Sequence, residues 1–337
     1  MLYSNIHTNQ AEDFREEMED DSTIEIEVDP MLIEEVVLNE LNRRDLTQDG
    51  GAIEDYHQRV DPLYDLPSKE KMDKFKKIHA DLFRVFGFEK ILKEILKEFP
   101  LINNVIKKIY FLRAIKEEIA DLTTDDEVQG EKSDKQPNTV IARLSADSFS
   151  NIEHLNMVTR HELMHIHDML DENFGYKLIL PALPPLEKTL VIDKYRIIWD
   201  IYIDTRILRN GQNTIRDKDA HYKDFESTYL KIPKLERKQI FEGLWEMETL
   251  THDEILELSR DVNKLISKFT SHKEKIFLPG NPCPLCKFPT YDWMTRLEEK
   301  VDEEIILIIQ KEFPNWIPNE GACERCIECY QTISPKT

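Results

Sequence analysis

Cysteine is missing from most of the sequence, and all five cysteines lie from Cys283 onward. An odd, clustered set argues against a disulfide framework and favours metal binding. No apolar run approaches the roughly 18–20 residues of a membrane span. Met1–Gln10 lacks the basic and apolar regions of a signal peptide. These absences predict a cytoplasmic protein with no membrane span.

Basic residues are also scarce, since 45 Lys and Arg face 66 Asp and Glu, for a net charge of −21. Such a chain repels phosphates, which makes nucleic acid an unlikely partner. Apolar residues make up 40% of the 337 positions, enough for a core in one large domain or a few smaller ones. We find no internal repeat.

The N-terminal region, residues 1–65, is predicted to be an acidic, disordered tail. Glu12–Asp29 is rich in carboxylates and poor in aromatic residues, a composition that buries too little apolar surface to fold. Within the tail, Pro30–Leu41 has helical apolar spacing, so it could dock on its own domain or on a protein partner.

Residues 66–275 are predicted to form one mainly helical domain. Ser68–Leu122 shows helical apolar stripes, and Thr139–Phe149 has the β-branched residues and loose alternation of a strand. Helices are expected at about 151–170 and 186–209, the second ended by Asn210-Gly211. A separate cysteine-rich module follows at 276–337. The fold class expected is therefore α+β, mainly helical.

The strongest motif is His161-Glu162-Leu-Met-His165, which reads HExxH. On a helix, residues four apart lie about 40° apart around the axis, so both imidazoles can meet one ion. Glu162 then lies beside the ion, where a base can act on metal-bound water. The motif predicts a metal-dependent hydrolase.

By this motif, its helix and the preceding strand, the chain resembles the zincin metallopeptidases. The resemblance implies that His161 and His165 bind a catalytic Zn²⁺ and that Glu162 is the general base. In the metzincin branch, a third ligand would align with Asp171. That branch also has a glycine, which allows a sharp turn, where this chain has Asp168. Asp171 therefore stays an alternative ligand.

In the gluzincin branch, the third ligand comes from a downstream helix, and here that helix carries Asp200 and Asp204 on one face. The helix is apolar almost all round, and a buried carboxylate is costly unless it is paired or metal-bound. We expect Asp200 to be the ligand and Asp204 to accept a hydrogen bond from a ligand histidine. The two roles could be exchanged. Ion pairs with nearby arginines, namely Arg196, Arg206 and Arg209, are the other interpretation.

Two tyrosines on the same helix, Tyr195 and Tyr202, are candidate donors to an oxyanion, because zincins often use a tyrosine or histidine there. Each could equally be a packing residue of the core. His167, two positions beyond His165, points to the other side of its helix and is not expected to be a ligand.

The cysteine-rich module contains two CxxC pairs, and four thiolates suit a closed, tetrahedral structural Zn²⁺ site. The module resembles zinc ribbons, although the interval between its pairs is longer than usual. Cys329 could replace one ligand or be a spare thiol. The predicted ligands are Cys283, Cys286, Cys323 and Cys326.

Together these features predict a zinc-dependent hydrolase with one catalytic and one structural Zn²⁺. A metallopeptidase acting on a protein or peptide is the leading hypothesis. One alternative is a protease of the SprT type, which also joins HExxH to a zinc ribbon but uses a histidine as third ligand. Another is a zinc-binding adaptor without catalytic activity.

Overall fold

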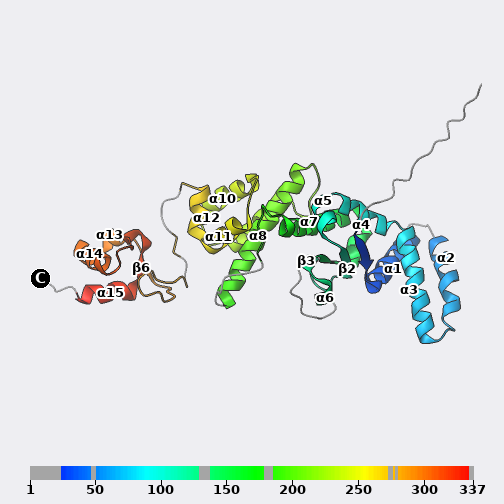
Figure 1. Cartoon of the computed structure of the whole chain (residues 1–337). Coiled ribbons are helices and arrows are strands. Elements are labelled where there is room, and N and C mark those ends of the chain that lie inside the picture. Colours follow the sequence, from blue (N-terminus) through cyan, green and yellow to red (C-terminus); the bar gives the residue numbers. More distant parts are fainter. Residues whose placement is uncertain are drawn as a thin grey trace, which may run out of the picture. The chain divides into compact units, whose positions relative to one another are not determined.

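The computed structural model describes residues 24–46, 51–128, 137–177, 185–271, 276–277 and 280–333. It divides into an N-terminal unit, Met1–Leu144, and a C-terminal unit, Ser145–Thr337. The division falls inside the predicted domain 66–275. The fold is mainly helical with small sheets, as expected (Figure 1). No helix in the described ranges is long and apolar enough to cross a membrane.

The N-terminal unit combines helices with a sheet. Its described elements are β1 (Glu25–Val28), α1 (Pro30–Leu46), α2 (Gly51–Val60), η1 (Asp61–Leu63), α3 (Ser68–Val85), α4 (Phe88–Lys97), α5 (Pro100–Val105), β2 (Lys108–Arg113), β3 (Ile119–Thr123), α6 (Asp125–Val128) and β4 (Thr139–Leu144).

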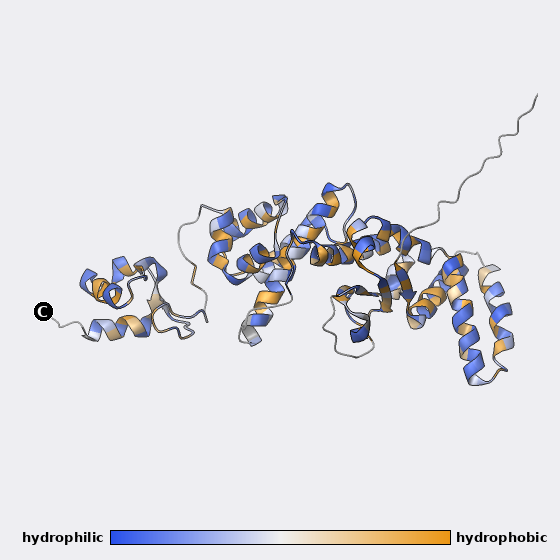
Figure 2. Cartoon of the chain, viewed as in Figure 1, coloured by the Kyte–Doolittle hydropathy of each residue, from blue (hydrophilic) through white to orange (hydrophobic). Residues whose placement is uncertain are grey.

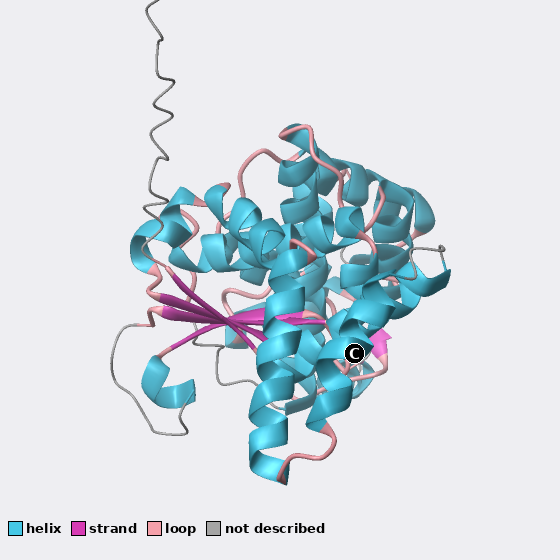
Figure 3. Cartoon of the chain, turned by 90° about the vertical axis from the view of Figure 1, so that its right-hand side faces the viewer, coloured by secondary structure: helices cyan, strands magenta, loops and turns pink. Residues whose placement is uncertain are grey.

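The sheet has the strand order β1-β2-β4-β3, drawn in magenta in Figure 3. Strands β1, β2 and β4 are parallel, and β3 runs antiparallel to β4. Residues Ile26, Ile109 and Val140 are in register across the parallel strands. Ile109, Phe111 and Val140 are fully buried, so the sheet supplies part of the core of this unit.

The prediction of a disordered N-terminal tail is wrong for the described residues of 24–65. The strand β1 pairs with β2, and α1 buries Leu32, Val36 and Val37. The helical spacing seen at Pro30–Leu41 is thus confirmed, and the helix packs against α2 and α3 of its own unit. Residues 1–23, which hold much of the acidic stretch, lie outside the described residues.

The helical assignment of Ser68–Leu122 is correct for α3, α4 and α5 but wrong for β2 and most of β3. In β2, residues Ile109 and Phe111 alternate with more exposed neighbours. Ile109 and Tyr110 also fit a helical spacing with Val105 and Ile106, which favoured a helix in the sequence. The predicted strand at Thr139–Phe149 ends at Leu144, and the 3₁₀ turn η2 (Ala146–Ser150) follows it.

The C-terminal unit begins with helices and ends with the cysteine module, which we define as residues 280–333. Its remaining described elements are α7 (Ile152–Leu170), α8 (Pro185–Arg209), α9 (Lys218–Thr228), α10 (Lys234–Glu246), α11 (His252–Arg260), α12 (Val262–Phe269), β5 (Trp293–Met294), α13 (Leu297–Lys300), α14 (Glu303–Glu312), η3 (Pro318–Glu320), β6 (Ala322–Cys323) and α15 (Glu324–Ile333).

The predicted HExxH helix and the predicted aspartate helix both exist, as α7 and α8. The side chain of Asn151 caps α7 by accepting hydrogen bonds from the backbone N–H groups of Glu153 and His154. Apolar residues occur on several sides of α8, and Ile198, Ile201 and Ile203 are fully buried. In Figure 2, orange hydrophobic segments alternate with blue ones along the helices, as expected where each helix buries part of its surface.

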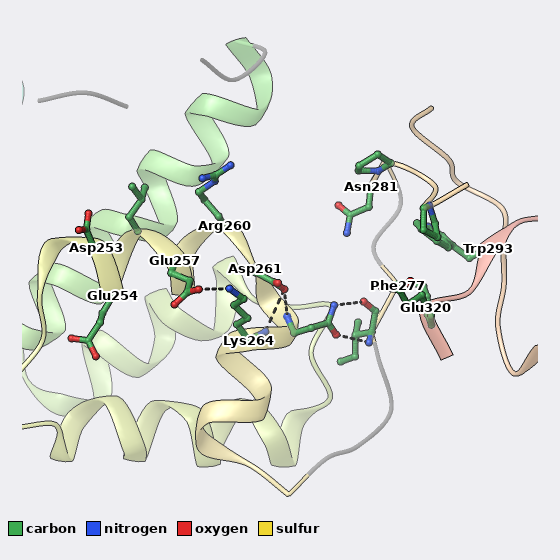
Figure 4. Close-up of a pocket in the computed structure, with 15 residues that line it drawn as sticks. Asp253, Glu254, Glu257, Arg260, Asp261, Lys264, Phe277, Asn281, Trp293 and Glu320 are labelled. Atoms are coloured by element: carbon green, nitrogen blue, oxygen red, sulfur yellow. Dashed lines mark hydrogen bonds and ion pairs between the residues drawn. The ribbon is translucent and has the colours of Figure 1, made fainter. Parts of the chain in front are cut away.

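Helices α9, α10 and α11 pack against α8, and α12 packs on α10 and α11. Their buried apolar residues form one core. Asp261 caps α12, and the side chain of Lys264 pairs with Glu257 of α11 (Figure 4). The Asn263 side chain exchanges two hydrogen bonds with the backbone of Ile276, 2.7 and 3.1 Å long. These bonds tie α12 to residue 276, where the cysteine-rich segment was predicted to begin.

In the cysteine module, α13 and α14 are separate helices, with Val301 in an extended conformation between them. The short strands β5 and β6 pair antiparallel. The small core contains Leu285, Leu297 and Ile309.

The end of α8 is a Schellman motif, and Gly211 has a φ of +77°. Gly211 N–H donates to the carbonyl of Leu208, and Gln212 N–H donates to that of Ile207. We predict that Gly211→Ala lowers the free energy of unfolding by about 1 kcal/mol, because a Cβ disfavours this conformation.

Urea unfolding followed by tryptophan fluorescence would measure this loss, since all four tryptophans lie in the C-terminal unit. Gly211→Asn is the matched control, because asparagine tolerates positive φ and should lose less. Equal stability of the alanine variant and the unchanged protein would contradict the prediction.

Candidate metal centre

Helix α7 brings the two motif histidines together. The His161 and His165 rings are 5.0 Å apart between centroids, and both lie one turn apart on the same face of the helix. Glu162, between them in sequence, is 9% exposed. His161 and Glu162 are thus largely buried in the C-terminal unit, whereas His165 is partly exposed.

Asp200 of α8 lies opposite the two histidines. Its Oδ1 is 3.3 Å from His165 Nε2 and 3.9 Å from His161 Nε2. One ligand atom from each residue lies within 4.8 Å of the other two. Ligands about 2.1 Å from a tetrahedral Zn²⁺ lie about 3.4 Å from one another, so this spacing fits one metal ion. Two imidazoles and a carboxylate also match a catalytic zinc set, which keeps one position open.

Asp204, one turn beyond Asp200, does not belong to this group. It is fully buried, and its Oδ1 accepts a 2.7 Å hydrogen bond from His161 Nδ1. With one ring proton fixed on Nδ1 by this bond, Nε2 of His161 is the nitrogen left to lose its proton and bind a cation beside Asp200 and His165. The structure thus separates two aspartates that the sequence left interchangeable.

The carboxylates make this site attractive to cations. Burial opposes protonation of His161, but Asp204, Asp200 and Glu162 together raise its pKa to about 9. Burial likewise opposes ionisation of Asp200 and Asp204, yet their histidine partners hold both pKa values below the ordinary aspartate value. A divalent cation would satisfy the same excess of negative charge.

Asp171 and Asp168 have other contacts. Asp171 follows the last residue of α7, and its Oδ1 accepts hydrogen bonds from Asn173. Asp168 is fully buried and accepts from Trp199 Nε1 at 2.7 Å and from Arg206 at 2.6 Å. Neither joins the histidine group.

Two of the arginines considered as ion-pair partners for Asp200 and Asp204 bind elsewhere. Arg206 pairs with Asp168, and Arg209 donates to the carbonyls of Trp245 and Met247. For Asp200, the polar neighbours that the structure gives are the two motif histidines.

The two candidate tyrosines also have partners of their own. The hydroxyl of Tyr195 is hydrogen-bonded to His252 Nδ1 at 2.8 Å, and burial raises its pKa. The ring of Tyr202 lies under the Arg206 guanidinium, 4.1 Å from its centre. The Tyr195 hydroxyl thus joins α8 to α11, whereas the Tyr202 contact lies within α8.

An aromatic wall lies beside His165. The rings of Trp199 and His165 are nearly perpendicular, at 87°, with 4.3 Å between their centroids. Phe174 and Tyr176 stack on Trp199 at 5.4 and 5.8 Å. These contacts hold the His165 ring in one orientation and shield it from water on that side.

One residue near the candidate site was not predicted from the sequence. His221 of α9 is 2% exposed, and its Nε2 lies 2.7 Å from Asp204 Oδ2. A single histidine without a neighbouring motif gives no local signal. Only the need of a buried carboxylate for a second donor could have suggested such a partner.

The cysteine module contains a second group that could hold a metal, made by Cys283, Cys286, Cys323 and Cys326. Cys286 and Cys323 sulfurs are 3.8 Å apart, the separation expected for thiolates about 2.3 Å from a tetrahedral Zn²⁺. The backbone N–H of Cys323 donates to Cys283 Sγ at 3.2 Å. Cys329 is exposed and outside this group.

No family model, curated protein or solved structure matches this chain. The zincin resemblance therefore stays a prediction, and the geometry of the site is what bears on function. The pocket drawn in Figure 4 does not contribute to it, because none of its lining residues belongs to either metal group.

The Asp168–Arg206 ion pair joins α7 to α8, and it gives a stability prediction. Asp168→Asn removes the negative charge and leaves the mostly buried Arg206 without a counter-charge. The free energy of unfolding should fall by about 3 kcal/mol, the lower end of the range for a broken buried pair.

Asp171→Asn is the matched control, three residues along the chain. Among the described residues, its carboxylate bonds to Asn173, within a turn that asparagine also favours. The loss for this variant should therefore stay below about 1 kcal/mol. Urea unfolding of both variants gives the comparison. Equal losses of unfolding free energy in the two variants would show that the buried ion pair contributes no more to stability than the exposed turn.

Proposed function

We propose that this protein is a zinc-dependent hydrolase, and more specifically a metallopeptidase. The observation that carries the proposal is the convergence of His161, His165 and Asp200 from two helices. The hydrogen bond from His161 to Asp204 supports it, because ligand histidines commonly donate their second N–H to a carboxylate.

Zn²⁺ held by His161, His165 and Asp200 would act as a Lewis acid and lower the pKa of a bound water to about 7. Glu162 would accept the proton of the attacking water on its carboxylate. It would then donate that proton to the leaving nitrogen of the cleaved amide. Trp199 and Asp204 would keep the two imidazoles oriented throughout.

Two further features bear on the choice between protease types. The third residue of the group is an aspartate, whereas the SprT type uses a histidine. Both His221 and His252 are engaged with other side chains. The net charge of −21 also disfavours work on nucleic acid. A protein or peptide substrate outside DNA repair therefore fits this chain better.

Metal analysis is the first test. The purified full chain should contain about two zinc ions, and His161→Ala and Asp200→Ala should each contain about one. The remaining ion would belong to the cysteine group, whose four thiolates bind zinc tightly on their own.

Asp171→Ala is the control for this test, because its carboxylate lies outside the group. It should retain both ions. If His161→Ala also retained both, the HExxH segment would not be a metal site. If Asp171→Ala lost one and Asp200→Ala did not, the ligand assignment would be wrong.

Glu162→Gln tests catalysis separately from metal binding. We expect this variant to keep two zinc ions and to cleave a mixture of unstructured peptides about 10²–10⁴-fold more slowly, as for loss of a general base. Mass spectrometry of the digest measures the rate. Glu153→Gln, an exposed change on the same helix, should cleave at the original rate.

The adaptor hypothesis predicts a different outcome. If the unchanged protein and Glu162→Gln behaved alike, with two zinc ions each and no cleavage by either, the fold would bind zinc without using it for hydrolysis.

A further inference from the structure

Both carboxylate oxygens of Asp204 are hydrogen-bonded. Its Oδ1 accepts from His161 Nδ1 and its Oδ2 lies 2.7 Å from His221 Nε2, while the residue itself has no exposed surface. A chain of three side chains thus runs from α7 through α8 to α9. Its first member is a residue of the metal group.

We propose that His221 is a positioning residue of the HExxH site, acting on the metal through Asp204 and His161. The inference rests on the proposed metal site and adds a residue that touches neither metal nor substrate. By donating to Oδ2, His221 fixes the plane of the Asp204 carboxylate. Oδ1 is then held where it orients the His161 ring.

The carboxylate needs this second contact because of its burial. A buried oxygen without a donor is costly, so loss of His221 would favour rotation of the carboxylate or its protonation. Either change weakens the bond from Oδ1 to His161 Nδ1. The His161 ring would then be free to turn its Nε2 away from His165 and Asp200.

His221 is itself well placed to act as a fixed donor. It lies in the first turn of α9, where Asp217 caps the helix and accepts from Ala220 N–H at 2.7 Å. Its backbone N–H donates to the Asp217 carbonyl at 3.1 Å. On one side, its ring lies 5.9 Å from that of Trp245. The ring therefore has a defined position before it meets Asp204.

The test compares side chains that differ in their donor at position 221. His221→Gln keeps an amide N–H near the position of Nε2, His221→Asn keeps one that is a methylene too short, and His221→Leu has none. Competition with a chromophoric chelator measures zinc affinity in the full chain. The zinc of the cysteine group, which these changes do not touch, serves as internal reference.

We expect His221→Leu and His221→Asn to weaken zinc binding at the HExxH site by about 10–100-fold, the usual effect of losing a group behind a metal ligand. His221→Gln should stay within about threefold of the original affinity. Because glutamine and asparagine are both polar, their comparison remains informative even if the leucine variant fails to fold.

If His221 had a purely structural role, any change that destabilises α9 should also weaken zinc binding. Our proposal predicts otherwise for a control on the same helix. Phe225→Leu, a change in the buried face of the same helix, should lower the unfolding midpoint without altering zinc affinity. In an Asp204→Asn background, His221→Leu should cause little further loss of affinity, because the contact through which it acts is already removed. Full additivity of the two changes would overturn the proposal.

The outcomes separate this inference from the proposed function. If His161→Ala keeps two zinc ions, the metal site itself is absent and both proposals fail. If His161→Ala loses one ion but His221→Leu and His221→Asn bind zinc with the original affinity, only the role of His221 fails.

Discussion

The hydrogen bond between His161 and Asp204 is the contact on which the candidate site depends. It joins residues 43 positions apart in sequence and is 2.7 Å long. Since Asp204 is fully buried, α8 could not present this face to the interior without such a donor. A second polar contact, Asp168 with Trp199 and Arg206, joins the same two helices. Two buried carboxylates thus set how α7 and α8 face each other, and Asp200 comes to the histidines as a consequence.

Much of the site could be predicted from the sequence because its parts are periodic along helices. The spacing of His161 and His165 needs only a helix, and so does that of Asp200 and Asp204. What the spacing could not decide was which aspartate reaches the histidines, because that depends on how α7 and α8 cross. His221 was not predicted as a site residue for the same reason, since what marks it is a contact with a residue on another helix.

The fold of the N-terminal unit was predicted less well. Acidic composition led to an expectation of disorder, yet β1 carries its glutamates on exposed positions, where Glu25 and Glu27 pair with Lys108 of β2. A strand with such residues can still form backbone hydrogen bonds to its neighbour, and composition alone does not reveal this pairing. For β2 the cause was different, because Ile109 and its apolar neighbours fit both a helical and a strand period. Only the partner strands β1 and β4 decide between the two.

The two groups of residues that could hold a metal ion differ in what surrounds them. The cysteine module has a small core of its own, so an ion closing the ring of four thiolates would contribute much of its folding free energy. The histidine group lies against a large core built on α8, which is packed by α9 to α12 without it. Apolar packing there does not involve these carboxylates, and keeping the buried Asp204 and Glu162 close to the partly exposed Asp200 costs free energy. Carboxylates kept together at such a cost fit the proposed metal site, because a bound cation would offset their negative charge.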